Sequence, residues 1–332
     1  MPPVQIETTP CALCGATTRR PLFTSRDTRY EDTPRDEFTL VECVECGLRY
    51  LCPRPAPESL GLFYPPQYYA PRLVSRDEMR RARRDGRGLM RRLRPTRKIR
   101  QLEEKVRHVR RLTPAAGRVL EIGPGGGDFL VALEDEGYAV TGLDRDQAAI
   151  RTMRDRLAVR VVHESEADAA IAPGSVDTVA LWNAFEHVSD PAGVLRRIRG
   201  WLRPGGHVVL SVPNGSALER SLFFRGDPCE DIPRHLFSFT PKTLRDLFVV
   251  HGFDRVGFRH GTLCSASELQ FRTEGRWVGA GRIPPGLYAV GILPAFWILD
   301  RVFGLAGRSH TVVAWARKPA VPPGSEGVEG AL

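Results

Sequence analysis

The feature that most constrains the fold is a glycine-rich segment between an apolar, strand-like run and a helix-like run. It extends from Val119 to Asp128 and has glycine at positions 123, 125, 126 and 127. Glycine lets a backbone turn sharply and approach a ligand without an intervening side chain. The amino end of the next helix then offers free N–H groups. The segment therefore predicts a ligand at the carboxyl end of a strand.

Strand-like and helix-like runs alternate from Arg118 onward. The predicted strands are Arg118–Ile122, Tyr138–Leu143, Val159–Val162, Val176–Trp182, His207–Val212, Phe253–Phe258 and His310–Arg317. The predicted helices are Asp128–Glu136, Gln147–Leu157, Ala192–Leu202 and a run from Pro241 to Gly252. This alternation is typical of an α/β domain with a largely parallel sheet that helices cover on both faces.

A carboxylate at the end of the second predicted strand narrows the choice of ligand. Asp144 can accept hydrogen bonds from both ribose hydroxyls, which indicates a nucleoside-containing cofactor. The dinucleotide fingerprint Gly-x-Gly-x-x-Gly fails, because Asp128 or Leu130 occupies the place of its third glycine. A Glu-x-Gly-x-Gly-x-Gly pattern fits at Glu121, Gly123, Gly125 and Gly127. The alternative is a glycine-rich turn without a ligand.

That pattern resembles the first motif of class I S-adenosylmethionine-dependent methyltransferases. The run from Val176 to Pro191 resembles the fourth-strand motif of the branch with the ubiquinone-biosynthesis O-methyltransferases. The runs Leu202–Gly206 and Ser211–Asn214 follow in the order of that branch. The resemblance covers roughly residues 118–261 and the last strand. It implies an α/β, Rossmann-like seven-stranded methyltransferase sheet with a reversed last strand.

The resemblance also implies which residues bind the cofactor. Glu121 would lie near the methionine part, the glycines would form the floor, and Asn183 would line the methyl-donor side beside Glu186. Ser165 takes the adenine-reading place of an aspartate found in relatives, with Glu166 as the other candidate. The implied cofactor-binding set is Glu121, Gly123, Gly125, Gly127, Asp144, Arg145, Ser165 and Asn183.

Two histidines are the candidate catalytic bases. A sulfonium methyl group is already electrophilic, so the protein mainly has to hold a nucleophile in line with it. A hydroxyl nucleophile also needs a proton acceptor, and His187 and His235 are the candidates. His235 follows the fifth predicted strand, in a connection that faces the acceptor in this branch. Alternatively, His235 braces that loop and His187 only begins a helix beside the pocket.

Four of the seven cysteines form two Cys-x-x-Cys pairs, each followed by glycine. The pairs are Cys11 with Cys14 and Cys43 with Cys46, separated by 28 residues. Such pairs suit a tetrahedral zinc ion, and four thiolates leave no open position for catalysis. Residues 1–70 therefore read as a structural zinc ribbon; two unrelated buried pairs or a redox dithiol are the alternatives.

This ribbon and the tyrosines after it resemble a domain attached to bacterial methyltransferases that modify sugars, surface glycans or natural products. The tyrosines are Tyr64, Tyr68 and Tyr69. They could close over an acceptor, although packing between the ribbon and the core is the preferred interpretation.

One segment accounts for the whole excess of positive over negative charge in the chain. The net charge is +9, whereas residues 72–111 alone contain 15 Arg and 2 Lys against 5 acids. Apolar residues at helical spacing from Ile99 to Leu112 favour a helix docked on the core with its charges exposed. Residues 71–112 therefore read as a basic helical linker. An RNA methyltransferase is the rival interpretation, although the stretch lacks interleaved aromatic residues.

An apolar insert, residues 262–309, interrupts the predicted methyltransferase domain, residues 113–319. Its longest uncharged run, Ile283–Leu299, contains prolines and is shorter than the roughly 20 residues of a membrane-spanning helix. A lid or packed hairpin is the first interpretation; a dimer contact and an interfacial membrane segment are the others. The amino terminus lacks signal-peptide features, which favours the cytoplasm or the inner membrane face. Residues 320–332 are predicted to be disordered.

The sequence therefore predicts methyl transfer from S-adenosylmethionine to a small-molecule, sugar or glycan-precursor acceptor, with O-methylation favoured over N- or C-methylation. RNA is the alternative partner. A non-catalytic binding module that kept the fold is the second alternative. Neither the acceptor nor the oligomeric state follows from the sequence.

Overall fold

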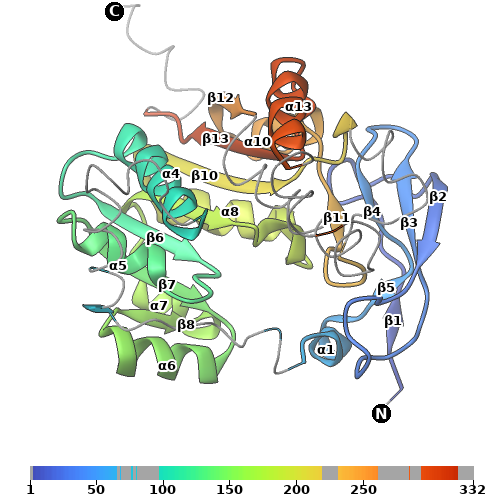
Figure 1. Cartoon of the computed structure of the whole chain (residues 1–332), viewed down its shortest axis with the longest axis horizontal. Helices are drawn as coiled ribbons and strands as arrows, with labels where there is room; N and C mark the ends of the chain where they lie inside the picture. The colour runs from blue at the N-terminus through green and yellow to red at the C-terminus, as the bar shows by residue number, and fades with distance from the viewer. Residues whose placement is uncertain are drawn as a thin grey trace, which may run out of the picture.

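The computed structural model describes residues 3–65, 68, 76, 77, 80, 97–218, 231–260, 284 and 293–320. Its largest sheet has seven strands in the order β12-β13-β10-β9-β6-β7-β8 (Figure 1). In chain order these are β6 (Arg118–Ile122), β7 (Ala139–Asp144), β8 (Val161–His163), β9 (Val176–Trp182), β10 (Leu202–Pro213), β12 (Asp254–Arg259) and β13 (Thr311–Arg317). Strands β6 to β10 pair in parallel, whereas β13 is antiparallel to β10 and β12. The predicted seven-stranded sheet with a reversed last strand is confirmed.

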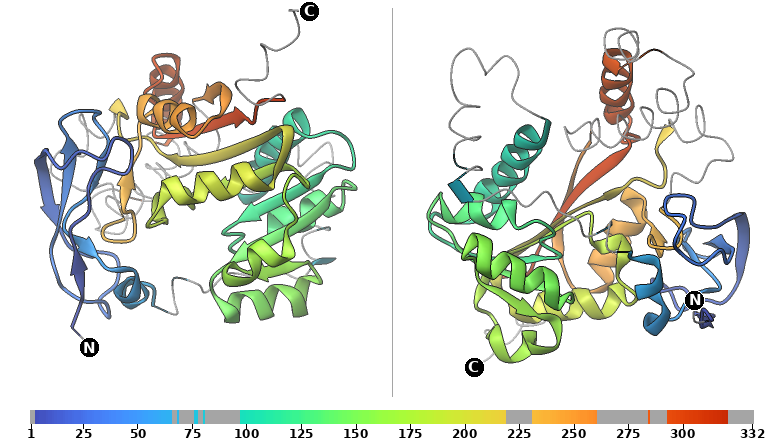
Figure 2. Two further views of the ribbon diagram at one scale, coloured as in Figure 1. Left: turned by 180° about the vertical axis from the view of Figure 1, so that it is seen from behind. Right: turned by 60° about the horizontal axis from the view of Figure 1, so that its bottom comes forward.

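Helices cover both faces of this sheet (Figure 2). The helices on one face are α4 (Arg97–Leu112), α5 (Asp128–Glu134) and α6 (Gln147–Leu157). Those on the other face are α7 (Ala167–Ala170), α8 (Pro191–Trp201) and α10 (Pro241–Val250). Successive strand residues point to opposite faces, so Val119 of β6 joins the first buried cluster and Leu120 joins the second. The sheet is therefore apolar on both sides.

Local side-chain caps fix where the helices begin. The Asp146 carboxylate accepts hydrogen bonds from two N–H groups of the first turn of α6, and Asp190 accepts one from α8. Thr240 caps α10, with Pro241 at the first helical position as the sequence predicts. These caps place the helix starts beside the carboxyl ends of the strands, where the candidate site lies.

A second, four-stranded sheet joins the amino-terminal segment to the large sheet. Its order is β11-β4-β3-β2, and β1 pairs separately with β5. The elements of this part are β1 (Ile6–Glu7), β2 (Arg19–Ser25), β3 (Phe38–Cys43), β4 (Arg49–Leu51), β5 (Arg54–Pro55), α1 (Pro57–Leu60), η1 (Gly61–Phe63) and β11 (Phe237–Ser238). Strand β11 comes from the connection after β10, so both parts of the chain build this sheet (Figure 1).

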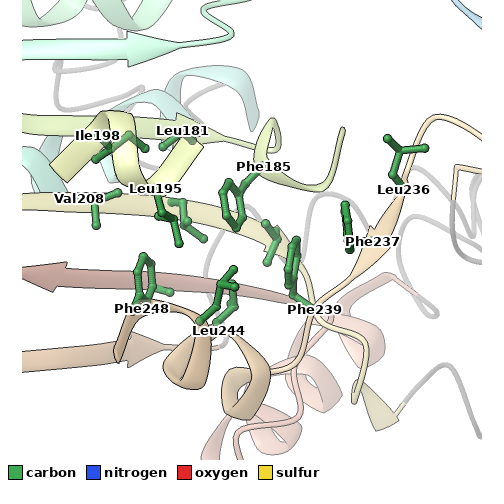
Figure 3. Close-up of a cluster of buried hydrophobic side chains, with 14 of the residues drawn as sticks. Leu181, Phe185, Leu195, Ile198, Val208, Leu236, Phe237, Phe239, Leu244 and Phe248 are labelled. Carbon is green, nitrogen blue, oxygen red and sulfur yellow. The ribbon is translucent and has the colours of Figure 1, made fainter. Parts of the chain in front are cut away.

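One buried hydrophobic cluster runs through this junction. It contains core residues of β9, α8, β10 and α10, and it continues into Leu236, Phe237 and Phe239 (Figure 3). The rings of Phe237 and Phe239 stack with centroids 5.6 Å apart, and Phe239 stacks on Phe185 at 5.1 Å. The same cluster includes Tyr50 and Leu51 of β4. The amino-terminal sheet is therefore packed into the core of the protein.

Several predicted features fall partly outside the described residues. Of the apolar insert the structure describes residues 284 and 293–309, including α13 (Leu293–Leu305). The rest of the insert, the tail beyond residue 320 that was predicted to be disordered, and much of the basic stretch lie outside the described residues, as does Tyr69. Across the ranges that can be described, no helix has both the length and the apolar character needed to cross a membrane.

Removing one buried side chain of α8 should destabilise the protein. Leu195 is fully buried in the shared cluster. We expect Leu195→Ala to lower the free energy of unfolding by about 2–5 kcal/mol, because it leaves a cavity in the core. The adjacent control Arg196→Ala, at an exposed position, should change it by less than about 0.5 kcal/mol. Urea unfolding measures both; equal effects would contradict this packing.

Candidate active site

The carboxyl ends of β6, β7 and β9 meet at a cavity of about 750 Å³. The strand ends and the glycine turn contribute Ile122, Gly123, Gly125, Gly126, Leu143, Asp144, Arg145, Trp182 and Asn183 to its wall. The starts of α6 and α8 contribute Ala148, Ala149, Thr152, Gly193, Val194 and Arg197. Tyr64 and Tyr68, which follow η1, also line it. The cavity is therefore built from the large sheet and from the amino-terminal part.

The glycine turn supplies backbone to this cavity. Gly123 and Gly125 have φ angles of +70° and +55°, in the left-handed region that glycine adopts without strain. A Cβ on Gly125 would meet nothing within 4 Å, so the space beside it is open to a ligand. Gly127 lies outside the cavity wall, where its Cβ would be 2.7 Å from Leu157 Cδ1. It therefore packs α5 closely against α6.

Glu121 lies near the end of β6 but behind the cavity wall. Its side chain is only 2% exposed, and its Oε2 atom has no hydrogen-bond partner among the described residues. Burial raises the pKa of this carboxyl from 4.5 to about 8, and the nearby Lys105 only partly opposes the shift. At neutral pH the group is therefore mostly protonated.

Asp144 and Arg145 stand together on the cavity wall at the end of β7. Burial raises the pKa of Asp144, while the backbone N–H of Asp146, 2.9 Å from Oδ1, lowers it. The Arg145 guanidinium lies over the ring of Tyr64, 5.1 Å from the centroid. The predicted ribose-binding acid and its neighbour thus face the same space as the glycine turn.

The predicted adenine reader lies beside this cavity and not in its wall. Ser165 lines a shallower neighbouring hollow, and its Oγ is 2.7 Å from His163 Nδ1. Glu164 is the residue of this turn that lines the main cavity. Recognition of adenine by Ser165 or Glu166 stays a prediction, and Glu164 joins them as a candidate that the sequence did not single out.

Asn183 holds a strained position directly after β9. Its φ angle is +52°, a conformation that asparagine adopts more readily than most residues. The Asn183 N–H donates to the carbonyl oxygen of Ser211 at 3.0 Å, and Ser211 Oγ donates to Asn183 Oδ1 at 2.8 Å. These bonds fix the side chain at the cavity wall.

Of the two candidate bases, only His187 lines the cavity. It ends the short helix η3 (Phe185–His187), and its Nδ1 is 3.0 Å from the carbonyl oxygen of Arg234 and 3.1 Å from Tyr64 Oη. A carbonyl oxygen only accepts, so Nδ1 carries the proton and Nε2 is the ring's acceptor. Burial, with repulsion from His235, lowers the pKa of His187 to about 3.

His235 is buried directly behind His187. The two rings meet edge to face with centroids 4.7 Å apart, and His235 Nε2 is 3.9 Å from Glu186 Oε1. Candidate ligand atoms of His187, His235 and Glu186 lie within 4.8 Å of one another, so these residues could also hold a metal ion. His235 contacts His187 and does not line the cavity, so its contact with a bound group would run through His187.

The four predicted cysteine ligands come together in the amino-terminal part. Their sulfur atoms lie within 4.8 Å of one another, with Cys11 and Cys46 at 3.4 Å and Cys14 and Cys43 at 3.5 Å. The glycine after each pair has a positive φ angle, as the tight turn requires. Four thiolates about 2.3 Å from one zinc ion would have their sulfur atoms about 3.8 Å apart. The arrangement fits such an ion.

Sequence reasoning missed several parts of the wall. It preferred a packing role for Tyr64 and Tyr68, yet these rings pack edge to face at 4.8 Å and also line the cavity. It did not single out Arg197 on α8, because an arginine on an amphipathic helix is usually solvated. It also passed over Arg234, which is fully buried.

Comparison with known proteins agrees with this geometry. Residues 90–256 match the family described as "Methyltransferase domain". A segment of 106 residues is 37% identical to the ubiquinone biosynthesis O-methyltransferase of Pectobacterium carotovorum, covering 30% of this chain and 44% of that protein. The enzyme of the same name from Ralstonia nicotianae is 38% identical over 111 residues, covering 31% and 47%. The match thus spans about half the length of these curated relatives.

Solved structures match this chain at low sequence identity and with TM-scores below 0.5. A SAM-dependent methyltransferase from Archaeoglobus fulgidus has a TM-score of 0.45 at 18% identity, covering 68% of this chain and 96% of that one. Phosphoethanolamine N-methyltransferase 2 from Haemonchus contortus has a TM-score of 0.45 at 16% identity, covering 91% and 68%. The family match covers half of the chain, and we conclude that the protein belongs to the methyltransferase domain family. This confirms the resemblance found in the sequence.

The raised pKa of Glu121 should appear in the pH dependence of stability. The folded state holds a proton on Glu121 that the unfolded state releases above pH 4.5, so stability falls as pH rises from about 4.5 to about 8. This group should contribute a loss of up to about 1.4 kcal/mol per pH unit in that window. Glu121→Gln, which cannot ionise, should remove that contribution, as measured by urea unfolding at several pH values.

The exposed Glu166 provides the control. Glu166→Gln should leave the pH slope of the unfolding free energy unchanged. An unchanged slope in Glu121→Gln as well would show that Glu121 is ionised in the folded protein.

Proposed function

We propose that this protein transfers a methyl group from S-adenosylmethionine to a hydroxyl group of a small-molecule, sugar or glycan-precursor acceptor. One observation carries the proposal: the glycine turn, the Asp144 carboxyl and the His187 ring line one cavity. The family match and the O-methyltransferase names of the curated relatives support the same reaction.

Different cavity residues would bind the methyl donor and the acceptor. Gly123 and Gly125 line the cavity, and the open space beside Gly125 lets a ligand approach the backbone. Asp144 offers a carboxylate to ribose hydroxyls. When bound, S-adenosylmethionine supplies an electrophilic methyl group. Asn183 and His187 line the same cavity, and we expect them to face the reacting centre. Holding the partners in line supplies most of the rate acceleration in such a transfer.

His187 is the better placed of the two candidate bases. Its Nδ1–H donates to the Arg234 carbonyl, which leaves Nε2 to accept the acceptor's hydroxyl proton. Its low pKa makes it a weak base in the free protein. A developing imidazolium would find Glu186 among its near neighbours, across the His235 ring. His235 remains the second candidate.

The size and lining of the cavity support a small acceptor. Its volume of about 750 Å³ lies within the range of small-molecule sites. Three arginines of the basic stretch form ion pairs with consecutive acids at the end of α5: Arg76 with Glu134, Arg80 with Asp135 and Arg110 with Glu136. These acids partly neutralise three arginines that, in the RNA interpretation, would bind phosphate groups.

We also propose that the four cysteines bind one structural zinc ion. The four thiolates would fill a tetrahedral coordination sphere, so the ion would stabilise the amino-terminal fold and take no part in the reaction. The cluster belongs to the part of the chain that supplies Tyr64 and Tyr68 to the cavity.

Removing the charge of Asp144 should weaken cofactor binding. We expect Asp144→Asn to raise the dissociation constant of S-adenosylhomocysteine about 10- to 100-fold, because hydrogen bonds to a charged group contribute about 1.5–3 kcal/mol. Isothermal titration calorimetry measures the change. The exposed Asp155→Asn variant on α6 should bind like the native protein; equal affinities in all three would remove Asp144 from the site.

Loss of either histidine should separate turnover from cofactor binding. On an acceptor found by screening hydroxylated small molecules and sugars, we expect His187→Ala to lower kcat by about 10²–10⁴-fold. We expect His235→Ala to lose most turnover too. Both variants should bind S-adenosylhomocysteine within about twofold of the native protein. Full turnover by one variant would exclude that histidine, and salt-sensitive RNA methylation would favour the rival substrate.

Zinc binding should depend on the four clustered cysteines. Elemental analysis of the native protein should find one zinc ion per chain, and Cys14→Ser should lose it and lower the melting temperature. The control Cys52→Ser changes a buried cysteine outside the cluster and should keep the metal. A metal-free native protein would refute the zinc site.

A further inference from the structure

Arg234 is a buried cation in the connection that follows β10. Its side chain has no exposed surface, although a buried cation is costly unless it is paired and hydrogen-bonded. Two of its N–H groups donate to the Asp27 carboxylate at 2.6 and 2.9 Å, and two donate to Asp231 at 2.7 and 2.9 Å. The fifth bond goes to the carbonyl oxygen of Phe63 at 2.8 Å. All five donors of the guanidinium are therefore used.

The partners of Arg234 come from both parts of the chain. Asp231 lies in the connection after β10, whereas Asp27 and Phe63 belong to the amino-terminal part. Asp27 is itself held by the N–H of Arg29 at 2.8 Å and the hydroxyl of Thr33 at 2.8 Å. The amino-terminal part thus presents a rigid carboxylate to an arginine of the other part.

The backbone of Arg234 contacts His187, the candidate base that lines the cavity. The carbonyl oxygen of Arg234 accepts from His187 Nδ1 at 3.0 Å. Phe63 precedes Tyr64, whose hydroxyl is 3.1 Å from the same nitrogen. Both groups that surround His187 Nδ1 are therefore anchored, one directly and one through its neighbour, to the guanidinium of Arg234.

We propose that Arg234 is a positioning residue which, clamped by Asp27 and Asp231, fixes His187 in its Nδ1–H tautomer at the cavity wall. The amino-terminal part thereby helps to set the state of the candidate base, in addition to lining the cavity. The expected effect on turnover rests on the proposed function. The tautomer of His187 does not, because it is a property of the protein without substrate. A side chain that fixes which imidazole nitrogen is protonated decides which nitrogen can accept a proton.

The tautomer is measured directly in protein labelled with ¹⁵N-histidine, by long-range nitrogen–hydrogen correlation spectra. His187→Gln identifies the signals of His187. In the native protein we expect the proton on Nδ1 across the neutral pH range. A native His187 protonated on Nε2 overturns the proposal without any clamp variant.

Two variants then test the clamp. Asp27→Asn keeps the shape of the carboxylate but cannot accept with its amide nitrogen, and Arg234→Lys keeps the charge but loses the five-donor fork. We expect either variant to give His187 a mixture of tautomers, and kcat on an identified acceptor to fall at least tenfold with the KM for S-adenosylmethionine unchanged. The control Arg20→Gln breaks an exposed ion pair with Glu42 in the four-stranded amino-terminal sheet. It should leave the His187 tautomer and kcat as in the native protein.

A folded Asp27→Asn or Arg234→Lys protein with a pure Nδ1–H His187 overturns the positioning role. Native S-adenosylhomocysteine binding in these variants distinguishes a lost clamp from a damaged cofactor site. Failure of the native protein to bind S-adenosylhomocysteine refutes the proposed function, whereas the tautomer of His187 still decides the clamp.

Discussion

One guanidinium group is buried between two parts of the chain, and its carboxylate partners come from both of them. Removing a cation from water costs several kcal/mol unless carboxylates and hydrogen bonds replace the lost solvent. Arg234 meets that requirement only when Asp27 and Asp231 are both in place. The amino-terminal sheet therefore cannot separate from the large sheet without exposing or orphaning buried charges. Strand β11 and the shared hydrophobic cluster strengthen the same junction.

This junction explains why the cavity has walls from both parts. A parallel sheet alone gives an open edge where its strands end, with helix starts around it. Here the segment after η1 covers that edge with Tyr64 and Tyr68. The family's glycine turn and acid supply one side, and the added segment supplies another. The added part thus contributes to the wall of the cavity.

Much of the large sheet could be predicted because its signals are local. The span Arg118–Ile122 and the cap at Thr240 follow from apolar patterning and from side-chain chemistry within a few residues. The role of Gly127 could not be predicted, because it depends on contact with Leu157 of another helix. The sequence also could not show that Glu164 lines the main cavity while Ser165 lines the neighbouring hollow, since the direction of one short turn decides which side chain faces which space.

The contact between the two parts of the chain could not be predicted from the sequence. Strand β11 has two residues, too few to show a period, and pairs with a strand nearly 190 positions earlier. Arg234 sits in a loop, where an arginine is normally solvated. Its burial follows from Asp27, more than 200 positions away. The cysteine pairs were easier to interpret, because metal-binding chemistry restricts both their spacing and the glycines that follow.

We propose that one cavity, walled by both parts of the chain, holds the methyl donor. A crystal structure of the native protein with S-adenosylhomocysteine tests it most directly. We expect the adenosyl group between the Gly123–Gly126 turn and the Asp144 carboxylate, with Tyr64 still in contact with His187. Density for the ligand at another place, or an amino-terminal sheet detached from Arg234 in the complex, would contradict it.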